Sequence, residues 1–151
     1  MRRSSIVALV AVLTMVLAVP AGLAATKKTR KVQSTFTGAV IANTSTGGAV
    51  VAGTVRDPLF GEGAIVYRTT PGPGGVLDST FTSFSDHGSF KGTARVRSTP
   101  QPDGSARLDG TGKVTKGTER YRGAKGSFTI SDGVIAADGK ITFTVKGTVR
   151  Y

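Results

Sequence analysis

Apolar and polar residues alternate along most of this chain from Val32 onward. A period of two residues is typical of β-strands, whose side chains point in turn to opposite faces of a sheet. The last eleven residues show this alternation clearly. One face carries Ile141, Phe143, Val145, Gly147, Val149 and Tyr151, and the opposite face carries only polar residues. No stretch after Val32 has the period of a long amphipathic helix, so the pattern predicts an all-β fold.

Eight strands are predicted from this alternation and from the turns between its segments. The turns are rich in Gly, Pro, Asn, Asp and Ser, and Asp103, Asp132 and Asp138 each precede a glycine, a pair that tight hairpins favour. Such short gaps favour antiparallel neighbours in a meander. The predicted strands cover residues 32–42, 48–56, 62–70, 76–85, 88–98, 105–115, 125–131 and 139–151.

Glycine recurs inside these strands on the predicted inner face, at Gly92, Gly110, Gly112 and Gly147. Because glycine there costs stability, we expect a geometric reason for it. Interior glycines let strands curve around a barrel or let opposite walls approach closely, and closure removes exposed sheet edges. We therefore predict an antiparallel eight-stranded meander closed into a small barrel, with a two-sheet β-sandwich as the alternative.

The N-terminus has the layout of a secretory signal. Two arginines precede an apolar stretch over residues 6–19, which Pro20 and several small residues follow. We expect residues 1–25 to be a signal peptide cut after Ala24 or Ala25, with a retained membrane anchor as the alternative. The mature protein would then be secreted, extracellular or periplasmic, with no membrane span.

The mature chain is predicted to consist of a flexible basic arm over residues 26–31 and a single β-barrel domain over residues 32–151. The arm is either a solvated tail or an element that binds an anionic envelope polymer or a membrane. Beyond it, 14 basic residues face 9 acidic ones, a surplus too small and too evenly spread to indicate a specific nucleic-acid groove. The basic residues of the arm are Lys27, Lys28, Arg30 and Lys31.

Side chains for catalysis or metal binding are sparse. The chain has no cysteine, which excludes disulfides and thiolate metal sites. Its single histidine, His87, lies in a serine-rich turn without the strained elbow or oxyanion loop of an acyl-transfer triad. The carboxylates are spread singly along the chain, unlike a metal site. We therefore assign no catalytic residue, no metal ligand and no cofactor, and an enzymatic function is not favoured.

Aromatic residues fall on the predicted inner face. An eight-stranded barrel is wide enough to be plugged by its own side chains or to hold one small ligand, and the pattern leaves both open. A ligand would be apolar with few polar groups, because few inward positions carry charge. The predicted ligand-binding residues are Tyr67, Phe81, Phe90, Gly112 and Phe143, and the other inward aromatics are Phe36 and Phe128.

The segment GTERYRGAKG, residues 117–126, lacks the alternation. It is similar to the segment GTGxYxGAxG of the allene oxide cyclase and dirigent barrel superfamily, through Gly117, Thr118, Arg120, Tyr121, Gly123, Ala124 and Gly126. The resemblance implies an eight-stranded antiparallel barrel, with a tight turn and a single-turn helix between two late strands. It also implies a protein that cyclises, couples or binds small apolar molecules, although no catalytic residues of the family can be placed. Glu119 stands where the family usually has glycine, so we expect a change in the turn's backbone, since glycine alone tolerates positive φ freely.

Five basic residues surround this motif and could dock an anion or form a solvated rim: Lys113, Lys116, Arg120, Arg122 and Lys125. Three functions therefore remain. The preferred one is a secreted barrel that binds a small apolar molecule or serves as a structural or interaction module. The alternatives are a cyclase- or dirigent-like enzyme acting inside the barrel, and a polyanion-binding protein of the cell envelope.

Overall fold

A computed structural model describes residues 27–151, so the predicted signal peptide lies outside the described residues. The described part contains eight β-strands and two single-turn 3-10 helices, named η1 and η2. In chain order these are β1 (Thr29–Asn43), β2 (Ala49–Asp57), β3 (Gly61–Pro71), η1 (Pro73–Gly75), β4 (Val76–Ser85), β5 (Gly88–Pro100), β6 (Ala106–Gly117), η2 (Glu119–Tyr121), β7 (Lys125–Ile135) and β8 (Lys140–Arg150).

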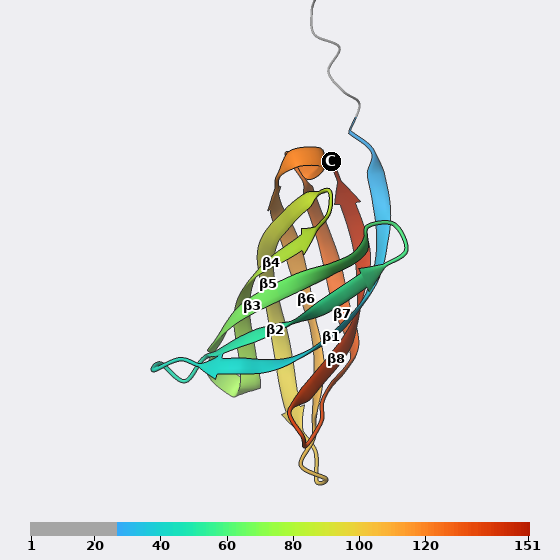
Figure 1. Cartoon of the computed structure of the whole chain (residues 1–151). Helices are drawn as coiled ribbons and strands as arrows, with labels where there is room; N and C mark the ends of the chain where they lie inside the picture. The colour runs from blue at the N-terminus through green and yellow to red at the C-terminus, as the bar shows by residue number, and fades with distance from the viewer. Residues whose placement is uncertain (1–26) are drawn as a thin grey trace, which may run out of the picture.

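The eight strands form one closed barrel in which each strand pairs antiparallel with its neighbours in the chain (Figure 1). The last strand, β8, pairs with β1 from Arg150 opposite Thr29 to Lys140 opposite Ala39, and this pairing closes the sheet. Every strand thus has a partner on both sides. The predicted eight-stranded meander barrel is confirmed, and the two-sheet sandwich is wrong.

The two ends of the barrel are named here after the 3-10 helix beside each. At the η2 end lie η2, the start of β1 and the end of β8, as Figure 1 shows near the C-terminus. Lys28 and Tyr151 run side by side there, because each backbone N–H donates to the other's carbonyl, at 3.0 and 3.3 Å. At the η1 end lie η1 and the turns that follow β1, β5 and β7.

β1 is longer than predicted. It begins at Thr29, so Arg30 and Lys31 lie in the barrel wall opposite β8 instead of in the flexible arm that the sequence predicted. The backbone ladder with β8 explains the difference, because it orders residues whose own side chains show no alternation. Only Lys27 and Lys28 of the described arm residues precede the strand.

β7 is also longer than predicted, and it continues to Ile135. A β-bulge between Ser131 and Val134 absorbs the Asp132–Gly133 pair, which the sequence indicated as a hairpin. Asp132 has a φ of +54°, in the left-handed region that Asp tolerates better than most residues. The pair therefore bends a strand instead of connecting two.

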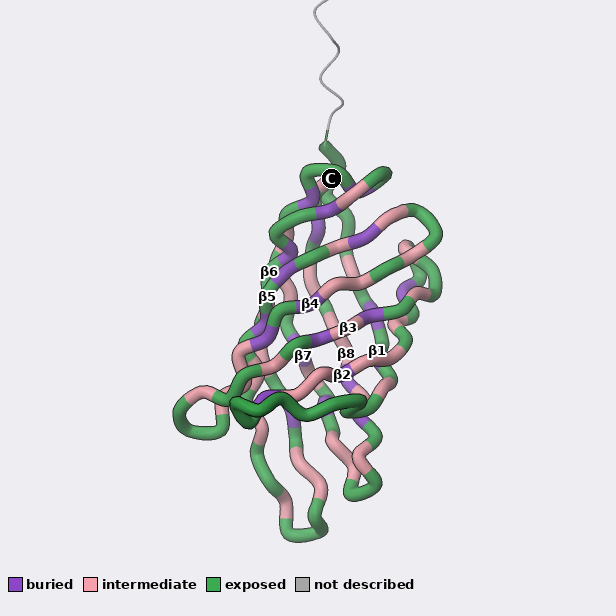
Figure 2. The backbone as a smooth tube through the Cα atoms, turned by 60° about the vertical axis from the view of Figure 1, so that its left-hand side comes forward, coloured by how far each residue is buried: buried purple, intermediate pink, exposed green. Residues whose placement is uncertain are grey.

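Inward side chains of all eight strands fill the barrel. Buried and exposed residues alternate along the strands in Figure 2, as expected for a wall with one core face and one solvent face. A central aromatic layer crosses the core. In it the Phe36 ring, 1 % exposed, stacks on Phe143 with centroids 4.5 Å apart and meets Tyr67 edge-on at 5.7 Å.

Phenyl rings cover two of the four inner glycines, Gly112 and Gly92, and a Cβ on Gly110 or Gly147 would meet the backbone of the neighbouring strand instead. A Cβ built on Gly112 would collide with the ring of Phe128, its direct partner on β7. Gly92 meets the ring of Phe81, its partner on β4, in the same way. Each ring thus occupies the space that a side chain at the glycine would need, and the glycine lets the neighbouring strand pack closely against the ring.

Candidate functional site

The aromatic layer divides the barrel interior into two cavities. A cavity of about 90 Å³ lies at the η2 end and one of about 180 Å³ at the η1 end, and Tyr67 and Phe143 line both. Pockets for drug-sized molecules measure roughly 300–1,000 Å³. The interior is therefore largely filled by its own side chains, and only a very small molecule fits in either cavity.

Four of the five predicted ligand-binding residues come together. Tyr67, Phe81, Phe90 and Phe143 all line the cavity at the η2 end. The fifth, Gly112, lines neither interior cavity, because the Phe128 ring occupies the space beside it.

Asp57, which lies between two of the predicted strands, is a buried carboxylate beside the η2-end cavity, 5 % exposed. One oxygen accepts hydrogen bonds from the backbone N–H groups of Leu59 and Phe60, at 2.7 and 3.1 Å. The other accepts from the Ser34 hydroxyl at 2.7 Å and the Gln33 N–H at 3.1 Å. Four donors fill the accepting positions of a carboxylate. Asp57 therefore fastens the β2–β3 turn to β1 and is not free to act on a ligand.

Residues 117–126 comprise the last residue of β6, the turn with η2 at the η2 end of the barrel, and the first two residues of β7. The single 3-10 turn lies between β6 and β7, and its Tyr121, 1 % exposed, stacks on Phe90 with centroids 4.2 Å apart. Glu119 takes a φ of +50°, so it adopts the left-handed backbone that glycine favours. A single-turn helix at this place agrees with what the family resemblance implies, and the resemblance itself stays a prediction.

The outer wall of β6, β7, β8 and β1 carries a basic face. Strand register places its outward side chains in three rows. The first row is Lys125, Arg150 and Thr29, the second is Lys113, Ser127, Thr148 and Lys31, and the third is Thr111, Thr129, Lys146 and Gln33. Five of these eleven positions are basic, the rest are hydroxyls and one amide, and none is acidic. We use the name basic face for these eleven residues.

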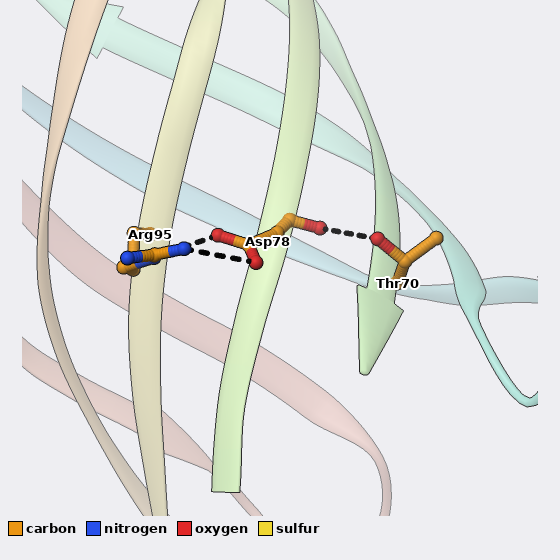
Figure 3. A network of polar contacts seen from close by, with 3 residues as sticks. All are labelled: Thr70, Asp78 and Arg95. Carbon is orange, nitrogen blue, oxygen red and sulfur yellow. Dashed lines mark hydrogen bonds and ion pairs between the residues drawn. The ribbon is translucent and has the colours of Figure 1, made fainter. Parts of the chain in front are cut away.

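The second and third rows lie in a hollow of about 1,230 Å³ that continues across β5, β4 and β3. The one acidic residue in the hollow is Asp78, whose carboxylate accepts hydrogen bonds from the Arg95 guanidinium at 2.8 and 3.3 Å (Figure 3). These hydrogen bonds hold the pKa of Asp78 below its ordinary value. Its charge is therefore matched locally, and the lysines of the hollow remain without an acidic partner.

The structure brings the two basic segments of the sequence to the same end. The Lys27 ammonium lies against Gly123, so the residue before β1 touches the turn that follows η2. Lys113 and Lys125, predicted as part of an anion site, belong to the basic face, and Lys116 lies at the end of the same strand β6. Lys31 and Lys146 join them through β-sheet register, which the sequence alone does not show.

No group of three or more His, Asp or Glu residues within residues 27–151 is arranged to hold a metal ion. In the same part of the chain, no helix is long and apolar enough to cross a bilayer. No protein-family model, curated protein or solved structure matches this chain. Its function must therefore be argued from the barrel itself.

Proposed function

We propose that this protein is a secreted module that binds an anionic polymer of the cell envelope on its basic face. The observation that carries the proposal is the composition of that face, with five cations and no acid over eleven outward positions. Neighbouring strands are about 4.8 Å apart and successive rows about 7 Å apart. Cations at these intervals can contact several charges of a repeating anion at once, and the hydroxyls between them can donate to its oxygens.

The ends of the chain extend this surface. Lys27 lies against Gly123 beside η2, and Arg120 and Arg122 are exposed on or beside that helix. The arm and the motif turn, which are separate anion-binding candidates in the sequence, therefore act together in this proposal. Glu119 is the acidic residue of the turn, and the basic residues Arg120 and Arg122 follow it in the chain.

Interior chemistry of a cyclase or dirigent type has less support. Such an enzyme needs a free acid or base beside its substrate, and Asp57, the buried carboxylate of the described residues, is engaged in four hydrogen bonds. The two small cavities also leave little room for a substrate that must fold. We therefore place the polymer-binding site on the outer wall and propose no reaction inside the barrel.

Charge reversal tests the proposal, with linear polyphosphate as the probe. The variant Lys125→Glu with Arg150→Glu changes two neighbours of the first row. The variant Arg107→Glu with Lys140→Glu changes the net charge equally at the η1 end and serves as control. We expect the first variant to lose at least about tenfold in affinity at 0.15 M salt, and the slope of log K against log salt to flatten by about two, one for each lost contact. Equal losses in both variants, or no binding by the unaltered protein, would contradict the proposal.

Secretion is tested separately by mass spectrometry of the protein recovered from the medium or periplasm of its own host. We expect a chain that has lost its first 24 or 25 residues. An intact chain that stays with the membrane fraction would contradict a cleaved signal peptide and support the retained anchor.

A further inference from the structure

Two hydroxyl groups in the barrel core have no hydrogen bond to any residue between 27 and 151. They belong to Tyr67 on β3 and Ser79 on β4, each 7 % exposed. The buried hydroxyls of Ser34 and Ser89, in contrast, each share a hydrogen bond with a neighbouring side chain. Every fully enclosed side-chain nitrogen or oxygen in the described part has a partner. The hydroxyls of Tyr67 and Ser79 must therefore reach open space.

Both residues line the cavity of about 180 Å³ at the η1 end, while Tyr67 also lines the η2-end cavity and Ser79 also borders the outer hollow. Register places Tyr67 opposite Phe81 and Ser79 opposite Thr69, so Tyr67 and Ser79 are diagonal neighbours on adjacent strands and face the same way. Residues in this relation are about 7–8 Å apart, within reach of one small molecule. The Thr69 hydroxyl beside them is already bonded to the backbone of Ala49.

The rest of this cavity is mostly apolar, with walls that include Leu77, Val96, Leu108, Ile130 and Ile141. Val40 also lines it and is 43 % exposed, so the cavity has an opening beside β1. Burial raises the pKa of Tyr67 well above its ordinary value, so its hydroxyl stays protonated and able to donate. An apolar cavity with an opening and two unused hydroxyls has the composition of a small-molecule site.

We propose that the η1-end cavity binds a monocyclic, mostly apolar molecule with one hydroxyl or carbonyl group, which hydrogen-bonds to Tyr67 and Ser79. The size follows from the volume, since a dry cavity of about 150 Å³ accepts benzene. The single polar group follows from the two hydroxyls, since an unpartnered polar group in a core costs free energy that a ligand can recover. This site lies inside the barrel and is independent of the basic face.

Phenol and toluene are suitable probes, because they have nearly the same shape and differ in one hydroxyl. Calorimetric titration of the protein purified from its host would give both affinities. We expect phenol to bind at least as tightly as toluene, although phenol is the better hydrated in water. In the variant Tyr67→Phe with Ser79→Ala, we expect the affinity for phenol to fall about tenfold and that for toluene to stay the same, since only the hydrogen bonds are lost.

Two further variants locate the site. Val40→Trp at the opening should reduce binding of both probes, whereas Ser83→Leu, which lines only the η2-end cavity, should leave both affinities unchanged. Thermal unfolding of the Tyr67→Phe, Ser79→Ala variant should begin no lower than that of the unaltered protein, because no internal hydrogen bond is lost. Failure of either probe to bind at millimolar concentration, unchanged phenol affinity in that variant, or a melting temperature several degrees lower would overturn the proposal.

Discussion

The contact between Gly112 and the Phe128 ring gives a sharp test of how the barrel is packed. Gly112 lies in β6 with no positive φ, so its backbone suits any residue. Replacing a glycine by alanine in such a place ordinarily stabilises a protein by about 0.4–1 kcal/mol, because the unfolded chain loses freedom. At Gly112 the new methyl group would instead meet the Phe128 ring and, at 2.7 Å, the carbonyl oxygen of Thr93. The packing argument therefore predicts the opposite sign.

We expect Gly112→Ala to destabilise the barrel by about 2 kcal/mol, in the middle of the range for an overfilled core. For a domain of this size the melting temperature should fall by about 8 °C. Calorimetry or circular dichroism at neutral pH would measure it. Thr111→Ala, at the neighbouring outward position, is the control and should change the melting temperature by far less.

A double variant separates the ring from the backbone as the cause. In a Phe128→Leu background, Gly112→Ala should cost at least about 1 kcal/mol less, because the ring is gone. The rescue should be partial, since the Thr93 carbonyl remains close. A neutral or stabilising Gly112→Ala in the unaltered protein would refute the reasoning.

Three other substitutions have definite expected outcomes. Asp57→Ala leaves buried donors without an acceptor, so denaturant titration should show a loss of about 3 kcal/mol, and an unchanged midpoint would contradict its role in the turn. Glu119 has a Cβ and a positive φ, so Glu119→Gly should relieve strain and raise the free energy of unfolding by about 0.5–1 kcal/mol, with a higher melting temperature. A lower melting temperature would mean that the Glu119 side chain stabilises the turn. Asp78→Asn should lower stability slightly at neutral pH, because the ionised Asp78 carboxylate is stabilised by Arg95 in the folded protein. Its pKa is therefore lower in the folded than in the unfolded chain, and this contribution to stability is complete above the ordinary pKa of the carboxyl group. That difference should vanish as the pH falls through the lowered pKa, and a difference that persists in acid would exclude the ion pair as its source.

Alternation of side chains made the fold predictable. Which residue faces inward is a local property of a strand, so the inner positions Phe36, Phe81 and Phe143 follow from the sequence alone. The start of β1 could not be predicted in this way, because Arg30 and Lys31 are ordered by a partner strand at the other end of the chain. The hairpin predicted at Asp132–Gly133 was wrong for a related reason. An Asp-Gly pair can form either a hairpin turn or a β-bulge, and the neighbouring strands decide between them.

The candidate sites were less accessible from the sequence. The arm and the motif turn were recognisable as basic, but Lys146 joins them only through pairing between β7, β8 and β1. Ser79 could not be identified as a site residue from the sequence, because it lies between two polar residues of a predicted strand. Only the structure shows that its hydroxyl has no partner among the neighbouring residues. Gly112 was expected beside a cavity because the sequence does not show that Phe128 lies directly opposite.

Pairing of the first strand with the last determines when the chain can acquire its shape. Thr29 and Arg150, which lie opposite each other, are 121 positions apart. Contacts so distant along a chain form late, because a long loop must close before they contribute. Until the eleven residues of β8 are available, β1 and β7 keep unpaired edges and the core stays open. A polypeptide that passes through a narrow channel with its N-terminus first would thus remain unfolded until its last residues emerged, which is the condition that export of an unfolded chain requires.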